Sequence, residues 1–303
     1  MKFNKLFSFI IISFVLYVSI GFISFAQDTS ENPVYFEEHD FESNQTIIKE
    51  ILIPELENTD EDQQSEPLVP PIDSNGIMPL DILGYYDSIE VNLNTKAPYK
   101  YIGKLHSTYS NGRTYTSEAY MIDQHRIVTC AHSVYKRDLG YPTKIEFVPG
   151  AKNKEEPYGR FKVRKSWFPN EYKTYTISNK YDYAVCVLEK YVNNGGDGIA
   201  VASAPINNPT GKNLLSGMNI CGYRDNKLFK QTGDVWFFEQ HELSYVLYTY
   251  MDAKKGYSGA PIYYKNVDNK FFSIGIITSG DDHLNYGRRF TMTQLIEFAS
   301  FVL

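Results

Sequence analysis

The sequence predicts a mainly β protein, and three observations support this. Strand-forming residues are abundant, with 25 tyrosines and 19 phenylalanines among 303 residues. Long helical periodicities are scarce. From residue 82 onward, short strand-like runs alternate with turn signals, which is the rhythm of a β-barrel or sandwich. Because 43% of the residues are hydrophobic, the chain can bury a large core.

The first 26 residues predict a secretory signal peptide. Lys2 and Lys5 precede an uncharged apolar run, residues 6–25, and small residues at Ser24 and Ala26 suit cleavage after Ala26. A run of 20 uncharged residues is also just long enough to span a bilayer. We therefore expect a secreted protein with no membrane partner after signal cleavage. An uncleaved anchor, with the protein at the cell surface, is the alternative.

Residues 27–80 form a strongly acidic segment. They hold 14 of the 36 acidic residues and one basic residue, Lys49, and they end in a proline-rich run. Residues 81–303 carry 27 basic against 22 acidic residues. A segment this acidic, with few aromatic residues, is not expected to build its own core. We interpret it as a largely disordered propeptide or stalk that has the globular domain, residues 81–303, as its partner.

The globular part divides near its middle. A glycine-rich run at residues 193–198 predicts a connection between two halves of similar size, about 81–195 and 199–290. At the end of the chain, Thr291 and Gln294 have capping-box spacing, and apolar residues follow at helical intervals. This pattern predicts a short C-terminal helix within residues 291–303.

Three cysteines, Cys130, Cys186 and Cys221, make an odd number without C-x-x-C spacing. No histidines stand at the intervals of a metal site. The sequence therefore predicts buried thiols and neither a metal nor another cofactor, while a bridge between Cys130 and Cys186 stays open.

A turn at residues 256–261 contains the candidate nucleophile, Ser258. A serine hydroxyl attacks a carbonyl when a base takes its proton and two fixed N–H groups receive the developing oxyanion. Gly256 lacks a Cβ and can turn its own N–H and that of Ser258 toward a common point. The same residues also suit an ordinary turn between strands, so the assignment depends on a base elsewhere.

A candidate base and its orienting group stand at the ends of two apolar strands. His132 follows the strand-like residues 126–130, which would hold the imidazole on a rigid element. Asp182 directly precedes the apolar residues 183–188, where a partly buried carboxylate needs a donor such as an imidazole N–H. Taken singly, a structural histidine and a turn-forming aspartate are the more common cases.

These motifs resemble those of the chymotrypsin-like serine peptidases, and they are most similar to the bacterial glutamyl endopeptidases. Residues 128–135, 182–185 and 256–261 carry the likeness, and residues 275–291 resemble the strand and loop that flank the substrate pocket. The resemblance covers residues 81–303. It implies two six-stranded antiparallel β-barrels, a His132–Asp182–Ser258 triad and an oxyanion hole from the N–H groups of Gly256 and Ser258. Residues 82–84 resemble the mature N-terminus, which implies a removable propeptide.

The resemblance also implies a substrate site. Residues 278–280 would pair with the substrate as an added strand. Ala253 and Ile277 stand where members that cleave after glutamate have threonine and histidine. Lys254 and Lys255 favour an acidic P1 residue, and His283 could supply the missing imidazole, whereas the nearby aspartates at 252, 281 and 282 favour a basic P1. The candidate substrate-binding residues are Asp252, Ala253, Lys255, Ile277, Thr278, Ser279 and Gly280.

The sequence thus predicts a secreted serine endopeptidase that is made as a zymogen. It would hydrolyse protein or peptide substrates through an acyl-enzyme, with an acidic P1 preference that the altered pocket leaves open. We expect a monomer with no nucleic-acid partner. The alternative is a catalytically silent, protease-like barrel that binds a peptide or a surface ligand.

Overall fold

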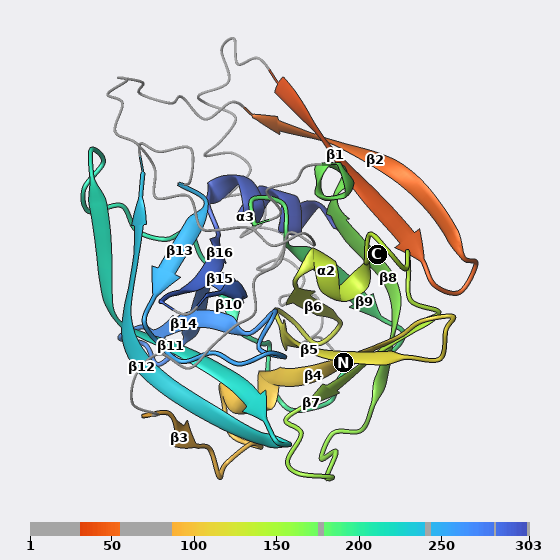
Figure 1. Ribbon diagram of the computed structural model, residues 1–303, viewed down its shortest axis with the longest axis horizontal. Coiled ribbons are helices and arrows are strands. Elements are labelled where there is room, and N and C mark those ends of the chain that lie inside the picture. Colours follow the sequence, from red (N-terminus) through yellow and green to blue (C-terminus); the bar gives the residue numbers. More distant parts are fainter. Residues whose placement is uncertain (1–30, 55–86, 175–178, 240–243, 282, 302–303) are drawn as a thin grey trace, which may run out of the picture. The chain divides into compact units, whose positions relative to one another are not determined.

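A computed structural model describes residues 31–54, 87–174, 179–239, 244–281 and 283–301 (Figure 1). The chain forms two compact units. One comprises residues 1–33 and 52–60, of which only strand residues 31–33 and 52–54 are described. The other comprises residues 34–51 and 61–303 and contains both barrels and the candidate site. The predicted signal peptide, residues 55–80 and the predicted mature N-terminus at 82–84 lie outside the described residues.

Six antiparallel strands close the first barrel. They are neighbours in the order β8-β7-β4-β5-β6-β9, and β9 pairs back with β8. Leu105, Ile127 and Phe147 are fully buried and belong to its core. The strands are β4 (Ile102–Thr108), β5 (Thr114–Met121), β6 (Arg126–Thr129), β7 (Lys144–Pro149), β8 (Phe161–Pro169) and β9 (Ala184–Leu188).

The second barrel has the same number of strands. Their order is β15-β14-β11-β12-β13-β16, closed by the pairing of β16 with β15. Val235, Leu247 and Ile262 lie in its core. The strands are β11 (Lys212–Arg224), β12 (Lys227–Phe238), β13 (Val246–Thr249), β14 (Pro261–Lys265), β15 (Phe271–Gly280) and β16 (Asn285–Arg289), and two short strands, β3 (Ile89–Glu90) and β10 (Ala200–Val201), pair with β12 and β15.

Local sequence explains several of the turns. Asp225 and Asn226 join β11 to β12 with φ values of 49° and 68°. Two successive residues with positive φ form the turn whose twist matches that of the flanking strands, and Asp and Asn tolerate this conformation. At the β5–β6 hairpin, the Asp123 carboxylate accepts the N–H groups of His125 and Arg126 at 2.7 and 2.6 Å. These turns set the register of the strands that lead to the candidate site.

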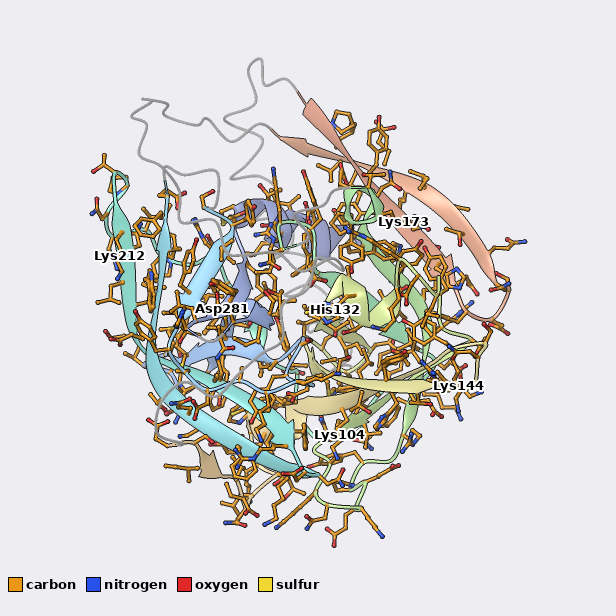
Figure 2. All side chains as sticks on the ribbon, viewed as in Figure 1. Lys104, His132, Lys144, Lys173, Lys212 and Asp281 are labelled. Carbon is orange, nitrogen blue, oxygen red and sulfur yellow. The ribbon has the colours of Figure 1, made fainter. Side chains whose placement is uncertain are left out.

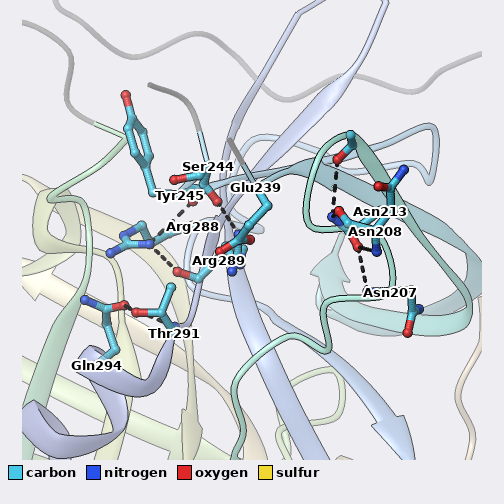
Figure 3. Close-up of polar contacts among 11 residues, drawn as sticks. Asn207, Asn208, Asn213, Glu239, Ser244, Tyr245, Arg288, Arg289, Thr291 and Gln294 are labelled. Carbon is cyan, nitrogen blue, oxygen red and sulfur yellow. Dashed lines mark hydrogen bonds and ion pairs between the residues drawn. The ribbon is translucent and has the colours of Figure 1, made fainter. Parts of the chain in front are cut away.

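Helices are few and short in the described residues, and none is long and apolar enough to cross a membrane. The C-terminal helix α3 (Met292–Ser300) begins with the predicted capping box, in which Gln294 Oε1 accepts the Thr291 N–H at 3.1 Å (Figure 3). The others are η1 (Tyr99–Tyr101), α2 (Ala131–Val134) and η2 (Asn170–Lys173). The predicted all-β fold of two six-stranded barrels with a short C-terminal helix is therefore confirmed.

One ordered element was not predicted. Strands β1 (Glu31–Asp40) and β2 (Gln45–Pro54) form a hairpin within the acidic segment, and β1 pairs with β8 of the first barrel (Figure 1). The expectation of a largely disordered segment thus differs from the structure over residues 31–54. The described residues 34–51 add a strand to an existing sheet, and Phe36 packs against Tyr183 and Phe301.

Candidate active site

His132 lies at the end of a buried strand. Strand β6 carries the fully buried Ile127 and Val128, and α2, a single helical turn, begins two residues beyond its end. The Tyr135 N–H donates to the Ala131 carbonyl at 2.9 Å and closes this turn. The imidazole is therefore fixed at the exit of the barrel, where it is labelled in Figure 2, and its exposed fraction is 8%.

Asp182 meets His132 because of strand pairing. Strands β6 and β9 are antiparallel, with Thr129 opposite Ala184, so the end of β6 lies beside the start of β9. Asp182 Oδ1 accepts the His132 N–H at 3.0 Å, and Oδ2 lies 2.7 Å from His132 Nδ1. The carboxylate is 1% exposed. A carboxylate at Nδ1 favours the tautomer in which Nδ1 carries the proton and Nε2 is free to accept another.

Ser258 lies in a tight turn between β13 and β14. The Tyr257 N–H donates to the Lys254 carbonyl and the Ala260 N–H to the Tyr257 carbonyl, both at 2.8 Å. Ser258 is partly exposed, and its Oγ lies 3.5 Å from the Thr278 carbonyl oxygen, which is a long hydrogen bond. The Ser258 hydroxyl is thus only weakly hydrogen-bonded, and its acceptor, the Thr278 carbonyl, lies near the end of strand β15.

The turn around Ser258 is fastened to the strand that precedes His132. The Glu118 N–H donates to the Ser258 carbonyl at 2.8 Å, and Thr129 Oγ1 donates to the Glu118 carbonyl at 2.6 Å. Gly259 has a φ of 93°, and a Cβ on it would lie 2.0 Å from the Glu118 carbonyl oxygen. Only glycine fits here. The serine turn and the histidine strand are therefore held together by contacts between the two barrels.

A second connection runs through Ile277. Its carbonyl oxygen accepts the Gly259 N–H at 2.8 Å and the Cys130 thiol at 3.2 Å. Gly259 follows the candidate nucleophile, and Cys130 is two residues before His132. Ile277 is therefore a junction between the two motifs, and its side chain lies in the core of the second barrel rather than on a pocket wall that could bind a charge.

Gly256 and Ser258 carry the N–H groups predicted for the oxyanion hole. Gly256 has a φ of 111°, a conformation that favours glycine. The N–H groups of Tyr257, Gly259 and Ala260 donate to backbone carbonyls. Those of Gly256 and Ser258 form no backbone hydrogen bond with any residue that the structure describes. Within the described residues, the two predicted oxyanion-hole donors thus have no backbone acceptor.

Residues 278–280 present a strand edge beside Ser258. Strand β14 pairs with β15 only as far as Pro261 opposite Ile276, whereas β15 continues to Gly280 and pairs there with β16. Ser279 and Gly280 lie opposite Tyr286 and Asn285. The side chains of Thr278 and Ser279 are buried, with Thr278 Oγ1 3.3 Å from the Tyr286 carbonyl. On the side of the serine turn, the end of β15 therefore pairs with no strand of the described residues beyond Ile276.

The remaining predicted pocket residues differ in exposure. Ala253 is buried in the core of the second barrel, and Asp252 is buried with its N–H donating to Gln231 Oε1 at 2.5 Å. Lys254 and Lys255 are exposed. The two lysines that favour an acidic P1 residue therefore face solvent beside the serine turn. Asp252, which would favour a basic P1 residue, has its side chain buried.

The loop after β15 is fixed by Asp281. Its Oδ1 accepts the N–H groups of His283 and Leu284 at 2.7 and 2.8 Å, and its Oδ2 accepts the Tyr286 hydroxyl at 2.5 Å. Burial raises the pKa of Asp281, but these donors lower it by more, so the pKa lies below its usual range. Asp281 therefore stabilises its own hairpin. His283 is exposed, and residue 282 lies outside the described part.

Cys130, His132 and Asp182 offer three potential metal ligands within 4.8 Å of one another. Their chemistry does not fit a metal. Burial, and secondly the charge of Asp182, raise the pKa of the Cys130 thiol well above its usual range, whereas a metal needs the thiolate. Both Asp182 oxygens already bind His132. The three cysteines are free and buried, as predicted, and the bridge between Cys130 and Cys186 is not formed.

Sequence reasoning missed Glu118. It lies in β5 and is 1% exposed, and its Oε1 accepts the Tyr223 N–H of β11 at 2.5 Å. Burial raises its pKa well above the usual range, against smaller opposing effects of the Tyr223 N–H and Lys104. Residues 117–121 are all buried, without the alternation of a half-exposed strand. The sequence signal for burial was therefore weak, because a single glutamate in a strand is normally expected to face solvent.

Comparison with known proteins supports the fold. No profile of a known protein family matches the chain. An extracellular metalloprotease of Bacillus subtilis (strain 168) is 24% identical over 221 residues, which cover 71% of this chain and 67% of that protein.

Solved structures with a similar fold are proteases. A Glu endopeptidase in complex with MPD has a TM-score of 0.56 and 21% identity, covering 72% of this chain and 98% of its own. The protease Anisep from Arthrobacter nicotinovorans has a TM-score of 0.53 and 18% identity, covering 66% and 94%. The thermostable serine protease AL20 has a TM-score of 0.53 and 18% identity, covering 67% and 98%. The chain therefore has the chymotrypsin-like fold, and the predicted resemblance is confirmed at that level.

Proposed function

We propose that this protein is a secreted serine endopeptidase with the triad His132, Asp182 and Ser258. The observation that carries the proposal is the Asp182–His132 pair, joined at 2.7 Å, at the same inter-barrel junction as the turn that presents Ser258. The protease relatives and the name "extracellular" of the Bacillus protein support the peptidase class and secretion. Synthesis as a zymogen, with residues 27–80 as the propeptide, is part of the proposal.

The reaction would proceed through an acyl-enzyme. Ser258 Oγ leaves its long contact with the Thr278 carbonyl and attacks the scissile carbonyl, while His132 Nε2 takes the hydroxyl proton. Asp182 holds the imidazole tautomer and stabilises the imidazolium. The N–H groups of Gly256 and Ser258 receive the oxyanion. His132 then protonates the leaving amine, and a water molecule hydrolyses the ester by the same steps.

The name of the Bacillus relative, a metalloprotease, raises metal catalysis as a second mechanism. Two observations argue against metal catalysis in this chain: the Cys130 thiol is buried and protonated, and both oxygens of the Asp182 carboxylate are hydrogen-bonded to His132. No step of the proposed reaction passes through a metal.

The P1 residue is proposed to be acidic. The exposed Lys254 and Lys255 stand beside the serine turn, and opposite charge at a pocket rim favours an acidic side chain. The apolar Ala253 and Ile277 supply no direct partner for a carboxylate, so the preference rests on the lysines and is expected to weaken at high salt.

Labelling by a fluorophosphonate probe tests the serine mechanism. We expect the purified, processed protein to be labelled, with the label lost in Ser258→Ala and in His132→Ala and retained in Ser110→Ala, a matched change at an exposed turn serine. A chelator should leave labelling unchanged. Cleavage of a mixed peptide library by the same preparation reports the P1 residue. Binding of library peptides without labelling or cleavage would favour the silent barrel instead.

A further inference from the structure

The acidic hairpin adds a strand to the first barrel. Strand β1 pairs antiparallel with β8 from Phe36 opposite Pro169 to Asp40 opposite Lys165. The Phe41 N–H donates to the Arg164 carbonyl at 2.8 Å and extends the ladder by one residue. Figure 1 shows β1 and β2 beside β8. Main-chain pairing of this kind gives affinity between an edge and an extended peptide, and side-chain pockets give specificity.

Phe36 anchors the hairpin. Its side chain is fully buried and lies edge-on to the rings of Phe301 and Tyr183, with centroids 5.0 and 6.5 Å away. The neighbouring Tyr35 points to the other face of the strand and is 41% exposed. A buried phenylalanine surrounded by aromatic rings contributes a large part of the binding free energy of a short docked segment.

Charged side chains pair across the same interface. Glu38 accepts Lys165 Nζ at 2.8 Å and Trp167 Nε1 at 2.7 Å. Burial raises the pKa of Glu38, but its hydrogen bonds with Lys165 and Trp167 lower it by more, so the pKa lies below the usual range. Glu37 is buried and binds Lys173 and the hydroxyl of Tyr141. These partially buried, hydrogen-bonded pairs are worth more than exposed ion pairs.

The described contacts of residues 34–51 lie away from the candidate catalytic groups. The hydrogen bonds, ion pairs and ring contacts of the described residues 34–51 with the rest of the unit go to β8, Tyr141, Lys173, Tyr183 and Phe301. Among these described contacts none reaches His132 or Ser258. The closest approach in sequence is Tyr183, the residue after Asp182, whose hydroxyl donates to Glu297 at 2.6 Å.

We propose that residues Val34–Ile51 remain docked on the first barrel after hydrolysis of the chain between Pro54 and Asp81, so that the mature protein has two chains and the hairpin is its bound subunit. The cut itself rests on the proposed function, since it is the zymogen cleavage. Hydrolysis there removes none of the contacts described above. It changes only the effective concentration of the hairpin, because the hairpin is then no longer covalently linked to the barrel. The aromatic and charged surface of β8 then acts as a peptide-binding site for the hairpin.

The test cuts the folded protein with an added enzyme. The chain carries Ser258→Ala, so that it cannot cut itself, and residues 62–67 are replaced by the recognition sequence of a site-specific protease. After complete cleavage at pH 7.5, the sample is separated by size exclusion at micromolar concentration, and fractions are analysed by mass spectrometry. We expect the N-terminal fragment to elute with the large fragment. Elution of the N-terminal fragment by itself overturns the proposal.

Two neighbouring residues supply a matched pair of variants. Phe36→Ala should raise the dissociation constant of the cut fragment by about 100-fold or more, because the anchor is lost. Tyr35→Ala should change this constant by less than about 3-fold. Equal effects of the two changes contradict the docking geometry. Should Phe36→Ala fail to fold, Glu38→Gln weakens both the Lys165 and Trp167 bonds and is expected to reduce retention by about 10-fold.

The outcome is separable from the proposed function. Retention is measured in protein that lacks the candidate nucleophile, with an added protease, so it does not depend on peptidase activity. Loss of fluorophosphonate labelling with retention of the fragment would contradict the function and leave the two-chain assembly standing. Labelling together with free elution of the fragment would do the reverse.

Discussion

At the scale of single residues, Glu118 contacts several parts of the candidate site. The backbone of Glu118 holds the Ser258 carbonyl and accepts the Thr129 hydroxyl, while its side chain accepts the Tyr223 N–H in the other barrel. One residue thus connects the serine turn, the histidine strand and β11. Burial raises the pKa of the Glu118 carboxyl well above its usual range, against smaller opposing effects of the Tyr223 N–H and Lys104.

Two substitutions test the role of this carboxyl. Glu118→Gln keeps an acceptor of the same shape. The equilibrium constant for folding and kcat/KM should both stay within about 3-fold of those of the original protein. Glu118→Ala leaves a cavity and an unpaired Tyr223 N–H, and should lower the free energy of unfolding by about 2–4 kcal/mol and reduce kcat/KM. Urea unfolding and peptide hydrolysis measure the two effects. Equal destabilisation by both changes would show that the ionised carboxylate is the form that matters.

Two of the candidate site residues stand in motifs that are local in the sequence. The positions of His132 and Asp182 follow from short strands with a polar residue at one end, and the structure brings the two side chains into contact. Glu118 could not be found in this way. Its partners are 105 and 140 positions away along the chain, at Tyr223 and Ser258, so no local pattern marks it.

At the scale of elements, the hairpin contains a group that responds to acid. His39 is buried, its ring stacks on Tyr141 at 3.8 Å, and its Nδ1 lies 2.8 Å from Thr46 Oγ1. Burial lowers its pKa. The charges of Glu37 and Asp40 raise it by less, and Lys173 lowers it further. The docked hairpin therefore binds a proton less readily than the released one.

The sign of the pH effect follows from linkage. A histidine whose pKa is depressed in the docked state favours docking above the ordinary imidazole pKa of about 6.5 and loses this contribution as the pH falls through the docked value. We expect retention of the cut fragment to decrease between pH 7 and pH 5, and His39→Phe, which keeps a stacked ring, to remove this dependence. Retention is the quantity to follow, because His106 and His125 also have lowered pKa values but lie in the barrel itself. Identical pH profiles for the two proteins would contradict the assignment to His39.

The hairpin also shows why an element can be missed. The sequence prediction judged residues 27–80 by their own charge and their few aromatic residues. The ion pairs that neutralise Glu37 and Glu38 come from Lys173 and Lys165, 136 and 127 positions further on. By contrast, the C-terminal helix was predicted because its capping box lies within four residues. Local signals identify elements, whereas strand addition depends on a surface elsewhere in the chain.

At the scale of the molecule, helix α3 connects the end of the second barrel with the first. Arg126 Nη1 donates to the carbonyls of Phe298 and Phe301 at 3.0 and 3.2 Å, and Tyr183 donates to Glu297. Burial raises the pKa of Glu297 to about 7, despite the opposing effects of Tyr183 and Arg288. Because burial is the larger effect, Glu297 binds a proton more readily in the folded protein than in the unfolded chain.

Glu297 should make the free energy of unfolding decrease as the pH rises. This is opposite in sign to the effect of His39, which favours docking of the hairpin at higher pH. A carboxyl whose folded pKa is raised stabilises the fold below its unfolded pKa of about 4.5 and loses that stabilisation as the pH rises toward 7. Glu297→Gln mimics the protonated form. The Tm of this variant minus that of the original protein should therefore increase from pH 5 to pH 8 in thermal unfolding. A difference that is constant across this range would exclude titration of Glu297.

The thiol contact between the barrels has a practical consequence. Cys130 is fully buried, and its Sγ donates across the junction to Ile277 in β15. An alkylating reagent can reach this sulfur only when the histidine strand and the serine turn move apart. The rate at which Cys130 is modified in the native protein, compared with Cys186 and Cys221 by peptide mass mapping, therefore reports how often the two sides of this inter-barrel junction separate.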